Sequence, residues 1–316
     1  MFVVIGSTTA DLLVLSQAPL AMPGGEGFQA SNLVFTDTPL RFSMGGNGGN
    51  SAYALAGLSM PTALCSSVGQ DALGKALAAW LEARNVNLDS FTRSDTDATS
   101  TSVILMSDAA NQVVFHHRGA NAGVRLKQMP DSLIADADVL LATSYPLLPH
   151  MRAGGFARAL ARVDESGGIT ALDIGPAIGD PVTLDEITPL LPVTRYLIAN
   201  THEITALTGC DDWERAAERL LNAGARNLVI KQGAAGASLR GSVGDVDVPG
   251  FDVEAAVSVG AGDAFNAGFL YGVQREFAPQ QAVRFGNAVA ALVVGSGRGI
   301  MGSPNLVEVE RLVAAG

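Results

Sequence analysis

The feature of this sequence that most restricts its fold is a series of short apolar runs separated by helix-like segments. The first run, FVVIG at residues 2–6, ends at a glycine and has the character of a strand that is buried on both faces. Four similar runs start at residues 137, 169, 195 and 227, with the sequences ADVLLAT, ITALDI, RYLIAN and NLVIKQG. This alternation predicts an α/β fold with a doubly wound, mostly parallel sheet flanked by helices.

Two stretches, residues 11–43 and about 97–118, depart from this alternation. They contain strand-like pieces without a helical period between them: DLLVLS, SNLVFTD, TSVILMSD and QVVFHH. They predict a small antiparallel sheet, inserted into a single domain that spans residues 1–316. Ligands of open α/β folds bind at the carboxyl ends of the parallel strands, so this sheet could serve as a lid over the site. The alternative is two exposed hairpins without a functional consequence.

Composition excludes several classes of partner. The formal net charge of −11 argues against a general attraction to nucleic acid or to an anionic membrane. Cys65 and Cys210 lack the spacing of metal ligands, which disfavours a disulfide framework or a structural zinc site. The apolar N-terminus carries Asp11 and lacks a basic segment, and no apolar run reaches the length of a membrane-spanning helix. We therefore expect a cytoplasmic protein.

The stretch VSVGAGDAFNAG, residues 257–268, places an aspartate after a Gly-Ala-Gly turn and before a helix predicted from about residue 264 to residue 273. The turn would offer backbone N–H groups at a helix N-terminus, which attracts anions. Asp263 could cap the helix, a contribution of ~1 kcal/mol. It could instead be a base that removes a proton from a substrate hydroxyl as that oxygen attacks a γ-phosphoryl group. The local sequence leaves both interpretations open.

A second glycine-rich loop, SMGGNGGNSAYALAGL at residues 43–58, leads into an alanine-rich helix. Glycines let the backbone approach a ligand closely, and Asn50 offers both a donor and an acceptor to a polyhydroxylated molecule such as a sugar. The alternative is an ordinary turn in which an asparagine caps the helix.

These two stretches resemble the signatures of the PfkB family of carbohydrate kinases, which have the ribokinase-like fold, and they occur in the family's order. Five intervening segments also match: GSTTADLLV, SSVGQDALG, HRGANAGV, NTHEITALTG and LVIKQGAAGA. The resemblance spans nearly the whole chain. The ordered combination is far more specific than any single segment.

The resemblance implies functions for the residues at the matched positions. Asp263 would be the catalytic base, beside an anion hole formed by Gly260, Ala261 and Gly262. The sugar hydroxyls would be held by Asp11, Gly46 and Asn50, with Gly45 allowing the loop to close on them. An ATP-dependent kinase that requires Mg²⁺ is therefore implied.

On the nucleotide side, the resemblance implies that Asn200 and Glu203 organise Mg²⁺ and the phosphates, mostly through water. Lys231 and Gly233 match the nucleotide-binding strand and its turn, and Asn287 matches the wall of the adenine pocket. Two ordinary alternatives remain: Glu203 as a solvated helix residue, and Lys231 as a surface lysine at a strand end.

Other polar residues carry weaker expectations. His116 and His117 are adjacent on a predicted strand, so at most one of them faces the site. Asp71 is expected to cap a helix. Asp173 ends an apolar strand and either lies near the site or serves a turn.

One departure from the family lies just before the anion hole. Many relatives carry Asp-Thr where this chain has Val257 and Ser258, so an oxygen ligand of the potassium site in ribokinases is missing. This difference puts potassium activation in question.

The sequence thus predicts phosphorylation of a primary hydroxyl of a sugar or sugar-like compound, as in ribokinases, fructokinases and 2-keto-3-deoxygluconate kinases. The absence of a basic cluster near the first signature favours an unphosphorylated acceptor. One alternative is a nucleoside kinase of the same fold, whose shelf for the base would come from Phe28, Phe35, Phe42 or Tyr145. The alternative of a different class is a non-catalytic sensor of nucleotide or sugar. The lid could also carry a homodimer contact.

Overall fold

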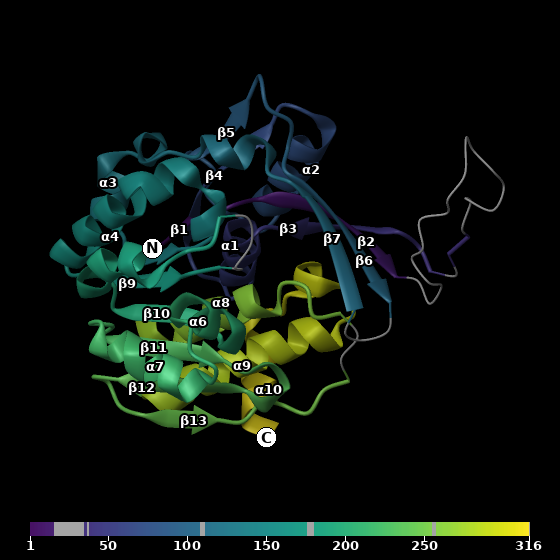
Figure 1. Cartoon of the computed structure of the whole chain (residues 1–316). Coiled ribbons are helices and arrows are strands. Elements are labelled where there is room, and N and C mark those ends of the chain that lie inside the picture. Colours follow the sequence, from purple (N-terminus) through teal and green to yellow (C-terminus); the bar gives the residue numbers. More distant parts are fainter. Residues whose placement is uncertain (16–34, 37, 108–110, 176–179, 255–256, 316) are drawn as a thin grey trace.

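Two β-sheets of unequal size organise the chain (Figure 1). The computed structural model describes residues 1–15, 35–36, 38–107, 111–175, 180–254 and 257–315. Within them a nine-stranded sheet forms the body of the molecule, and a four-stranded sheet extends from one side of it. The predicted α/β class and the predicted separate small sheet are both confirmed.

The large sheet has the strand order β13-β12-β11-β10-β9-β8-β1-β4-β5. In chain order its strands are β1 (Phe2–Ile5), β4 (Thr62–Gly69), β5 (Phe91–Ser94), β8 (Val139–Ala142), β9 (Ile169–Asp173), β10 (Tyr196–Asn200), β11 (Asn227–Lys231), β12 (Ala237–Gly241) and β13 (Val246–Val248). All pairs from β5 to β11 are parallel, whereas β12 and β13 add antiparallel strands at one edge. The five predicted runs became β1, β8, β9, β10 and β11, which are contiguous in the sheet.

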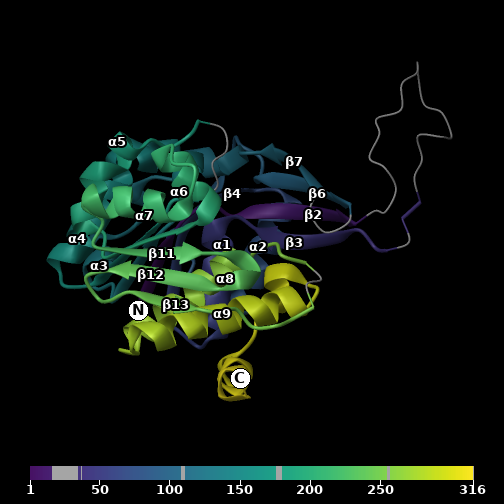
Figure 2. The ribbon, with the colours of Figure 1, turned by 60° about the horizontal axis from the view of Figure 1, so that its bottom comes forward.

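Helices cover both faces of this sheet, as Figure 2 shows. One face is covered by α1 (Asn47–Gly57), α2 (Ala72–Glu82), α8 (Ala261–Gln274), α9 (Pro279–Gly295) and α10 (Leu306–Ala315). The other is covered by α3 (Asp131–Ala135), α4 (Phe156–Glu165), α5 (Leu184–Ile187), α6 (Thr201–Thr208) and α7 (Trp213–Asn222). Successive side chains of a strand point to opposite faces. Accordingly Phe2 and Val4 pack in the first core, and Val3 and Ile5 in the second.

The small sheet has the order β3-β2-β6-β7 and combines segments that are far apart in the sequence. Its strands are β2 (Thr9–Leu15), β3 (Arg41–Gly45), β6 (Thr101–Ser107) and β7 (Asn111–His117). The pairs β2–β3 and β6–β7 are antiparallel as predicted, but the central pair β2–β6 is parallel. Most of the predicted strand at residues 31–37 lies outside the described residues.

Two predicted helix starts can be compared with the structure. Asp71 caps α2 as predicted, and its side chain accepts a hydrogen bond from the Gly74 N–H at 2.8 Å. Helix α8, by contrast, begins at Ala261, about one turn earlier than predicted. Asp263 therefore lies inside the first turn of the helix.

The strand order reverses its direction between β1 and β8, which creates a topological switch point in the sheet. In open α/β folds the crevice at the carboxyl ends of the strands beside such a point binds ligands. Across the described residues, no helix has the length and apolar character that crossing a membrane requires.

Candidate active site

Three neighbouring parallel strands of the large sheet have a polar residue at their carboxyl ends, which lie side by side. Asp173 is the last residue of β9, Asn200 of β10 and Lys231 of β11. Asn200 also begins α6: its side chain accepts a hydrogen bond from the Glu203 N–H at 2.8 Å, and the Glu203 carboxylate accepts one from the Asn200 N–H at 2.8 Å. This reciprocal capping box holds Glu203 next to the carboxyl end of β10.

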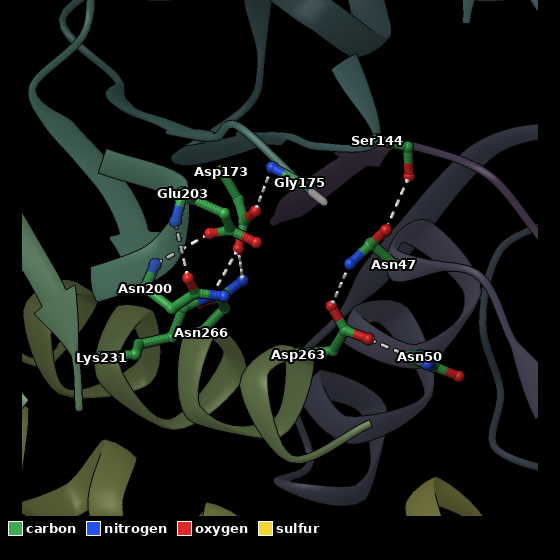
Figure 3. A network of polar contacts seen from close by, with 10 residues as sticks. All are labelled: Asn47, Asn50, Ser144, Asp173, Gly175, Asn200, Glu203, Lys231, Asp263 and Asn266. Carbon is green, nitrogen blue, oxygen red and sulfur yellow. Dashed lines mark hydrogen bonds and ion pairs between the residues drawn. The ribbon is translucent and has the colours of Figure 1, made fainter. Parts of the chain in front are cut away.

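Asp263 is held between two helices that begin at the site (Figure 3). Its two carboxylate oxygens accept hydrogen bonds from the amides of α1, at 3.0 Å from Asn47 Nδ2 and 2.8 Å from Asn50 Nδ2. Gly260, with φ 84°, is the residue that caps α8, and no side chain caps that helix end. Gly46 likewise caps α1 without a side-chain hydrogen bond, so neither Asp263 nor an asparagine of the first signature caps its helix, and both of those alternatives are wrong.

The Gly-Ala-Gly turn beside Asp263 presents backbone donors at the N-terminus of α8. The Ala261 N–H donates to the Ser258 carbonyl at 3.1 Å. Among the described residues, no acceptor is recorded for the N–H groups of Gly260 and Gly262. Of the three predicted anion-hole residues, two therefore offer free donors here, and Ala261 uses its N–H within the turn.

The small sheet contributes a row of polar side chains. Ser43, Asp11, Ser102 and His116 are cross-strand neighbours on β3, β2, β6 and β7. Ser102 Oγ lies 3.2 Å from His116 Nδ1. Among the described residues, the buried Oδ1 atoms of Asp11 and Asn50 have no hydrogen-bond partner, and an unmet buried acceptor calls for a ligand donor. His116 is thus the one histidine of the pair on the Asp11 side of the sheet.

The glycines of the first signature are required by close contacts. A Cβ atom at Gly45 would lie 2.0 Å from Asp11 Oδ2. Gly46 has φ +79°, and a Cβ there would lie 2.6 Å from the Ser7 carbonyl oxygen. Only glycine lets the loop pass this close to Asp11.

A second polar cluster joins β9, β11 and α8, and its connections were not predicted from the sequence. Lys231 Nζ lies 2.8 Å from Asp173 Oδ2 and 3.3 Å from Asn266 Oδ1. Asn266 Nδ2 donates to the same Asp173 oxygen, and the Gly175 N–H donates to Asp173 Oδ1 at 2.8 Å. Asp173 therefore serves both the turn and the site, which were offered as alternatives.

Burial changes the protonation of the carboxyl groups at the site. Desolvation raises the pKa of Asp263 to about 6, with a contribution from the negative charge of Asp173. Desolvation likewise raises the pKa of Glu203 to about 7 and that of Asp11 to about 7. For Lys231, burial lowers the pKa, but the charges of Asp173 and Glu203 outweigh it and the net shift is upward. The lysine is therefore an ammonium at neutral pH.

Lys231 and the carboxyl groups of Asp173, Glu203 and Asp263 line a cavity of about 860 Å³. Its polar wall contains Asn47, Asp173, Asn200, Glu203, Lys231 and Asp263. Its apolar lining residues are Phe251, Val253, Phe265, Ala290, Ala291 and Val294. Gly233 and Asn287 also line it, and the Asn287 amide donates to the carbonyl groups of Val248 and Pro249 at 3.1 Å each. The predicted nucleotide-side residues thus share one cavity.

The donor set suits magnesium bound mainly through water and phosphate. Within the described part of the chain, no group of three or more His, Cys, Asp or Glu side chains is arranged to hold a metal ion. Glu203 nevertheless offers a desolvated carboxylate beside the amide of Asn200, and Mg²⁺ prefers such hard oxygen ligands while keeping several waters. These two residues fit a hydrated ion and do not form a protein cage.

Three of the residues proposed as an aromatic shelf for a nucleoside are placed elsewhere. Tyr145 is buried and stacks on Phe156 at 5.2 Å between ring centroids. Phe42 follows the strand alternation onto the face of the small sheet opposite to Asp11, and Phe35 is 87% exposed. The fourth, Phe28, lies outside the described residues.

Comparison with known proteins decides the family. The model for the pfkB family carbohydrate kinases matches residues 1–306. The chain belongs to this family. It is a carbohydrate kinase, and the predicted family, fold and enzyme class are confirmed.

This PfkB kinase has curated relatives with named activities. It is 31% identical over 256 residues to the ATP-dependent ribose-1-phosphate kinase of Halopiger xanaduensis, which covers 81% of each chain. It is 28% identical over 315 residues to the ribokinase of Bacillus subtilis, covering 98% of each chain. Among solved structures, that of Arabidopsis thaliana ribokinase complexed with ribose and ATP has a TM-score of 0.80 at 23% identity and covers 99% of this chain and 98% of that one. The last comparison shows the shared fold.

Three site residues of this PfkB kinase were missed or left open by sequence reasoning: Asn47, Asp173 and Asn266. Asn47 lies in the first signature, where the sequence led us to assign a function to Asn50 and not to Asn47. Asn266 lies three residues after Asp263 on α8, so the helical period alone places it on the same side of the helix. For Asp173 the available signal was its position at the carboxyl end of a predicted parallel strand.

Proposed function

We propose that the chain transfers the γ-phosphoryl group of ATP to a primary hydroxyl of a sugar or sugar-like acceptor, with Asp263 as the general base. The observation that carries this proposal is the position of the Asp263 carboxylate. It lies in the first turn of α8, beside the free N–H groups of Gly260 and Gly262, and faces the loop of the first signature. A base and a site for an anion are thereby adjacent.

The proposed transfer needs only ATP with its Mg²⁺, the acceptor and the groups of the chain. Asp263 takes the proton of the acceptor hydroxyl, and the hydroxyl oxygen forms a bond to the γ-phosphorus. The bond from that phosphorus to the β–γ bridging oxygen breaks, and ADP leaves with the electron pair. The free N–H groups of the turn and the Lys231 ammonium stabilise the charge on the transferring group. Mg²⁺ bound with ATP near Asn200 and Glu203 would offset further phosphate charge.

The acceptor would lie between Asp263 and the small sheet. Asp11 and Asn50 each have an unmet carbonyl-type oxygen that can accept a hydrogen bond from a sugar hydroxyl. Gly45 and Gly46 keep this space open. The nucleotide would occupy the cavity on the other side of Asp263, with its base against the apolar wall near Asn287 and its phosphates near Gly233 and Lys231.

An ADP-release assay over a panel of acceptors tests the proposal. The panel contains ribose, fructose, 2-keto-3-deoxygluconate, adenosine and ribose 1-phosphate, the last because of the relative from Halopiger xanaduensis. Phosphorus NMR of the product then locates the new phosphoester. We expect turnover with at least one sugar and a phosphoester at a primary carbon.

Two outcomes would contradict the proposal. Binding of nucleotide and sugar without ADP release on any acceptor would support the non-catalytic sensor. Turnover confined to adenosine would support the nucleoside kinase.

A further inference from the structure

We propose that Asp173 and Asn266 are positioning residues of this kinase, which hold the Lys231 ammonium against the first turn of α8 so that it can neutralise a transferring phosphate. The inference rests on the proposed function and adds to it. Lys231 would touch the phosphate, whereas Asp173 and Asn266 would act through Lys231.

The contacts form a closed triangle. Lys231 Nζ lies 2.8 Å from Asp173 Oδ2 and 3.3 Å from Asn266 Oδ1, and the Asn266 amide also donates to Asp173 Oδ2. The second oxygen of Asp173 is used by the Gly175 N–H. The side chain of Asp173 is 2% exposed and that of Lys231 is 15% exposed. Both carboxylate oxygens of Asp173 thus accept hydrogen bonds within the protein (Figure 3), whereas Lys231 also lines the cavity.

The triangle places the ammonium at the anion site. A Cβ atom built on Gly262 would lie 3.5 Å from Lys231 Nζ, so the ammonium lies beside the turn whose Gly262 N–H has no acceptor within the described part of the chain. Asn266 is on the next turn of the same helix. The residue that anchors the lysine therefore belongs to the element that carries the base and the backbone donors.

The charges around the cavity explain why a fixed cation is needed. Among the described residues that line it, Lys231 is the only one with a cationic side chain, against the carboxylates of Asp173, Glu203, Asp252 and Asp263. A triphosphate entering such a cavity is repelled unless a positive charge faces it. A lysine side chain has many rotamers, so without anchors the ammonium would be spread over many positions.

A purely structural interpretation is an ion pair that ties β9 to β11. Buried ion pairs contribute little net stability, and this one opens onto the cavity wall. The two interpretations differ in what the Asp173→Asn variant changes. The structural interpretation predicts a lower melting temperature with the kcat of the folded enzyme unchanged. The positioning interpretation predicts a lower kcat.

The test is a double-mutant cycle of Asp173→Asn and Lys231→Met in the full chain. We measure kcat, the acceptor KM and the Kd of Mg²⁺ with the non-hydrolysable analogue AMP-PNP. We expect Asp173→Asn to lower kcat by about tenfold or more while the acceptor KM changes by less than about threefold. In the Lys231→Met background the same substitution should leave kcat unchanged, because no ammonium remains to be positioned.

The nucleotide affinities provide a readout that does not depend on the acceptor. Lys231→Met leaves the Asp173 carboxylate unpaired beside the phosphate site and should weaken analogue binding by about tenfold or more. Adding Asp173→Asn removes that repulsion and should restore several-fold of the loss. If no acceptor is turned over, the proposed function has failed, but the regained analogue affinity of the double variant still supports the inference. If the double variant regains no affinity, the inference is overturned.

Two further variants guard against misfolding and unrelated effects. Asn266→Ala removes one anchor without unpairing a charge, and it should lower kcat by a smaller factor in the same Lys231-dependent way. Asp164→Asn breaks a separate ion pair, with Arg226 at 3.0 Å, and should leave kcat and affinity unchanged. The inference is overturned if Asp173→Asn keeps the parent kcat, or lowers kcat equally in both Lys231 backgrounds.

Discussion

Asp263 has the two properties that a general base needs near neutral pH. Desolvation raises its pKa to about 6. Two asparagine amides donate hydrogen bonds to the carboxylate and thereby stabilise its charged form. A base is most effective when its pKa lies close to the working pH. An exposed aspartate with an ordinary pKa of about 4 would bind a proton about 100-fold more weakly and would therefore be a weaker base.

The raised pKa of Asp263 predicts the pH dependence of catalysis. The carboxylate is the active form, and lowering the pH through the pKa protonates it and removes activity. Asp11 and Glu203, whose pKa values are both raised to about 7, lie near it and add to the acid limb of kcat/KM. We expect kcat/KM to fall steeply below about pH 6 to 7. A pH–rate profile that stays flat down to pH 4 would contradict this expectation.

Gly45 is expected to be essential for the acceptor and dispensable for the nucleotide. The Cβ atom of Gly45→Ala would lie 2.0 Å from Asp11 Oδ2 and force that carboxylate to move. Losing a hydrogen bond to a charged group should raise the acceptor KM by about 10- to 100-fold. Titration with AMP-PNP should show an unchanged Kd. The control is Gly123→Ala, because a Cβ there meets no atom within 4 Å; equal effects of both variants would refute the explanation.

At the scale of elements, the sequence was sufficient to predict the strands whose ends carry the site residues. The apolar runs predicted β1 and β8 to β11, and the ends of three of them deliver Asp173, Asn200 and Lys231. Strand β4 was not predicted, although it is buried throughout. The hydroxyls of Ser66 and Ser67 accept hydrogen bonds from Thr8 and Thr92, which are distant in the chain, and local patterning does not reveal such partners.

The connections within the site were harder to predict than its members. The family signatures located Asp263 and Asn50. They did not predict that Asn50 donates a hydrogen bond to Asp263, which is 213 residues away in the chain. Lys231 and Asp173 are 58 residues apart, and their pairing depends on β10 lying between their strands. Strand order is a tertiary property, so periodicity and spacing alone do not specify it.

The loop before α8 packs against the small sheet through apolar contacts. Val257 is 4% exposed and packs with Leu13 of β2 and Ile104 of β6. An aliphatic side chain offers no oxygen to an alkali cation, so we expect potassium to be dispensable. Replacing potassium by choline in the kinase assay should change kcat/KM by less than about twofold. Activation by potassium of tenfold or more would show that other oxygen atoms form a cation site.

For the whole molecule, the proposed function assigns the two substrates to two different parts of the structure. The cavity proposed for the nucleotide is lined by residues of the large sheet, its helices and its loops, and the polar row proposed for the acceptor belongs to the small sheet. Asp263 lies between them. We expect the small sheet to close over the acceptor, so that both substrates meet at Asp263 with water excluded.

The outer face of the small sheet is apolar, which is the basis for expecting a homodimer through the lid. Phe42, Leu12, Val103 and Phe115 are cross-strand neighbours on this face, and Phe42 and Phe115 are 62% and 59% exposed. Exposed apolar surfaces of this kind often mark interfaces. Light scattering after size-exclusion chromatography should give twice the chain mass, and a Phe42→Ser/Phe115→Ser variant should give a monomer. A monomeric parent protein would refute the expectation.

The most direct test of the account is the turnover of Asp263→Asn. The substitution keeps the shape of the side chain and removes the base, so kcat should fall by about 10²- to 10⁴-fold. The Kd of AMP-PNP and of the acceptor should remain within about threefold of the parent values. Glu218→Gln, an exposed carboxylate of α7, is the matched control and should keep full activity. Turnover of Asp263→Asn at the parent rate would contradict the assignment of Asp263 as the base.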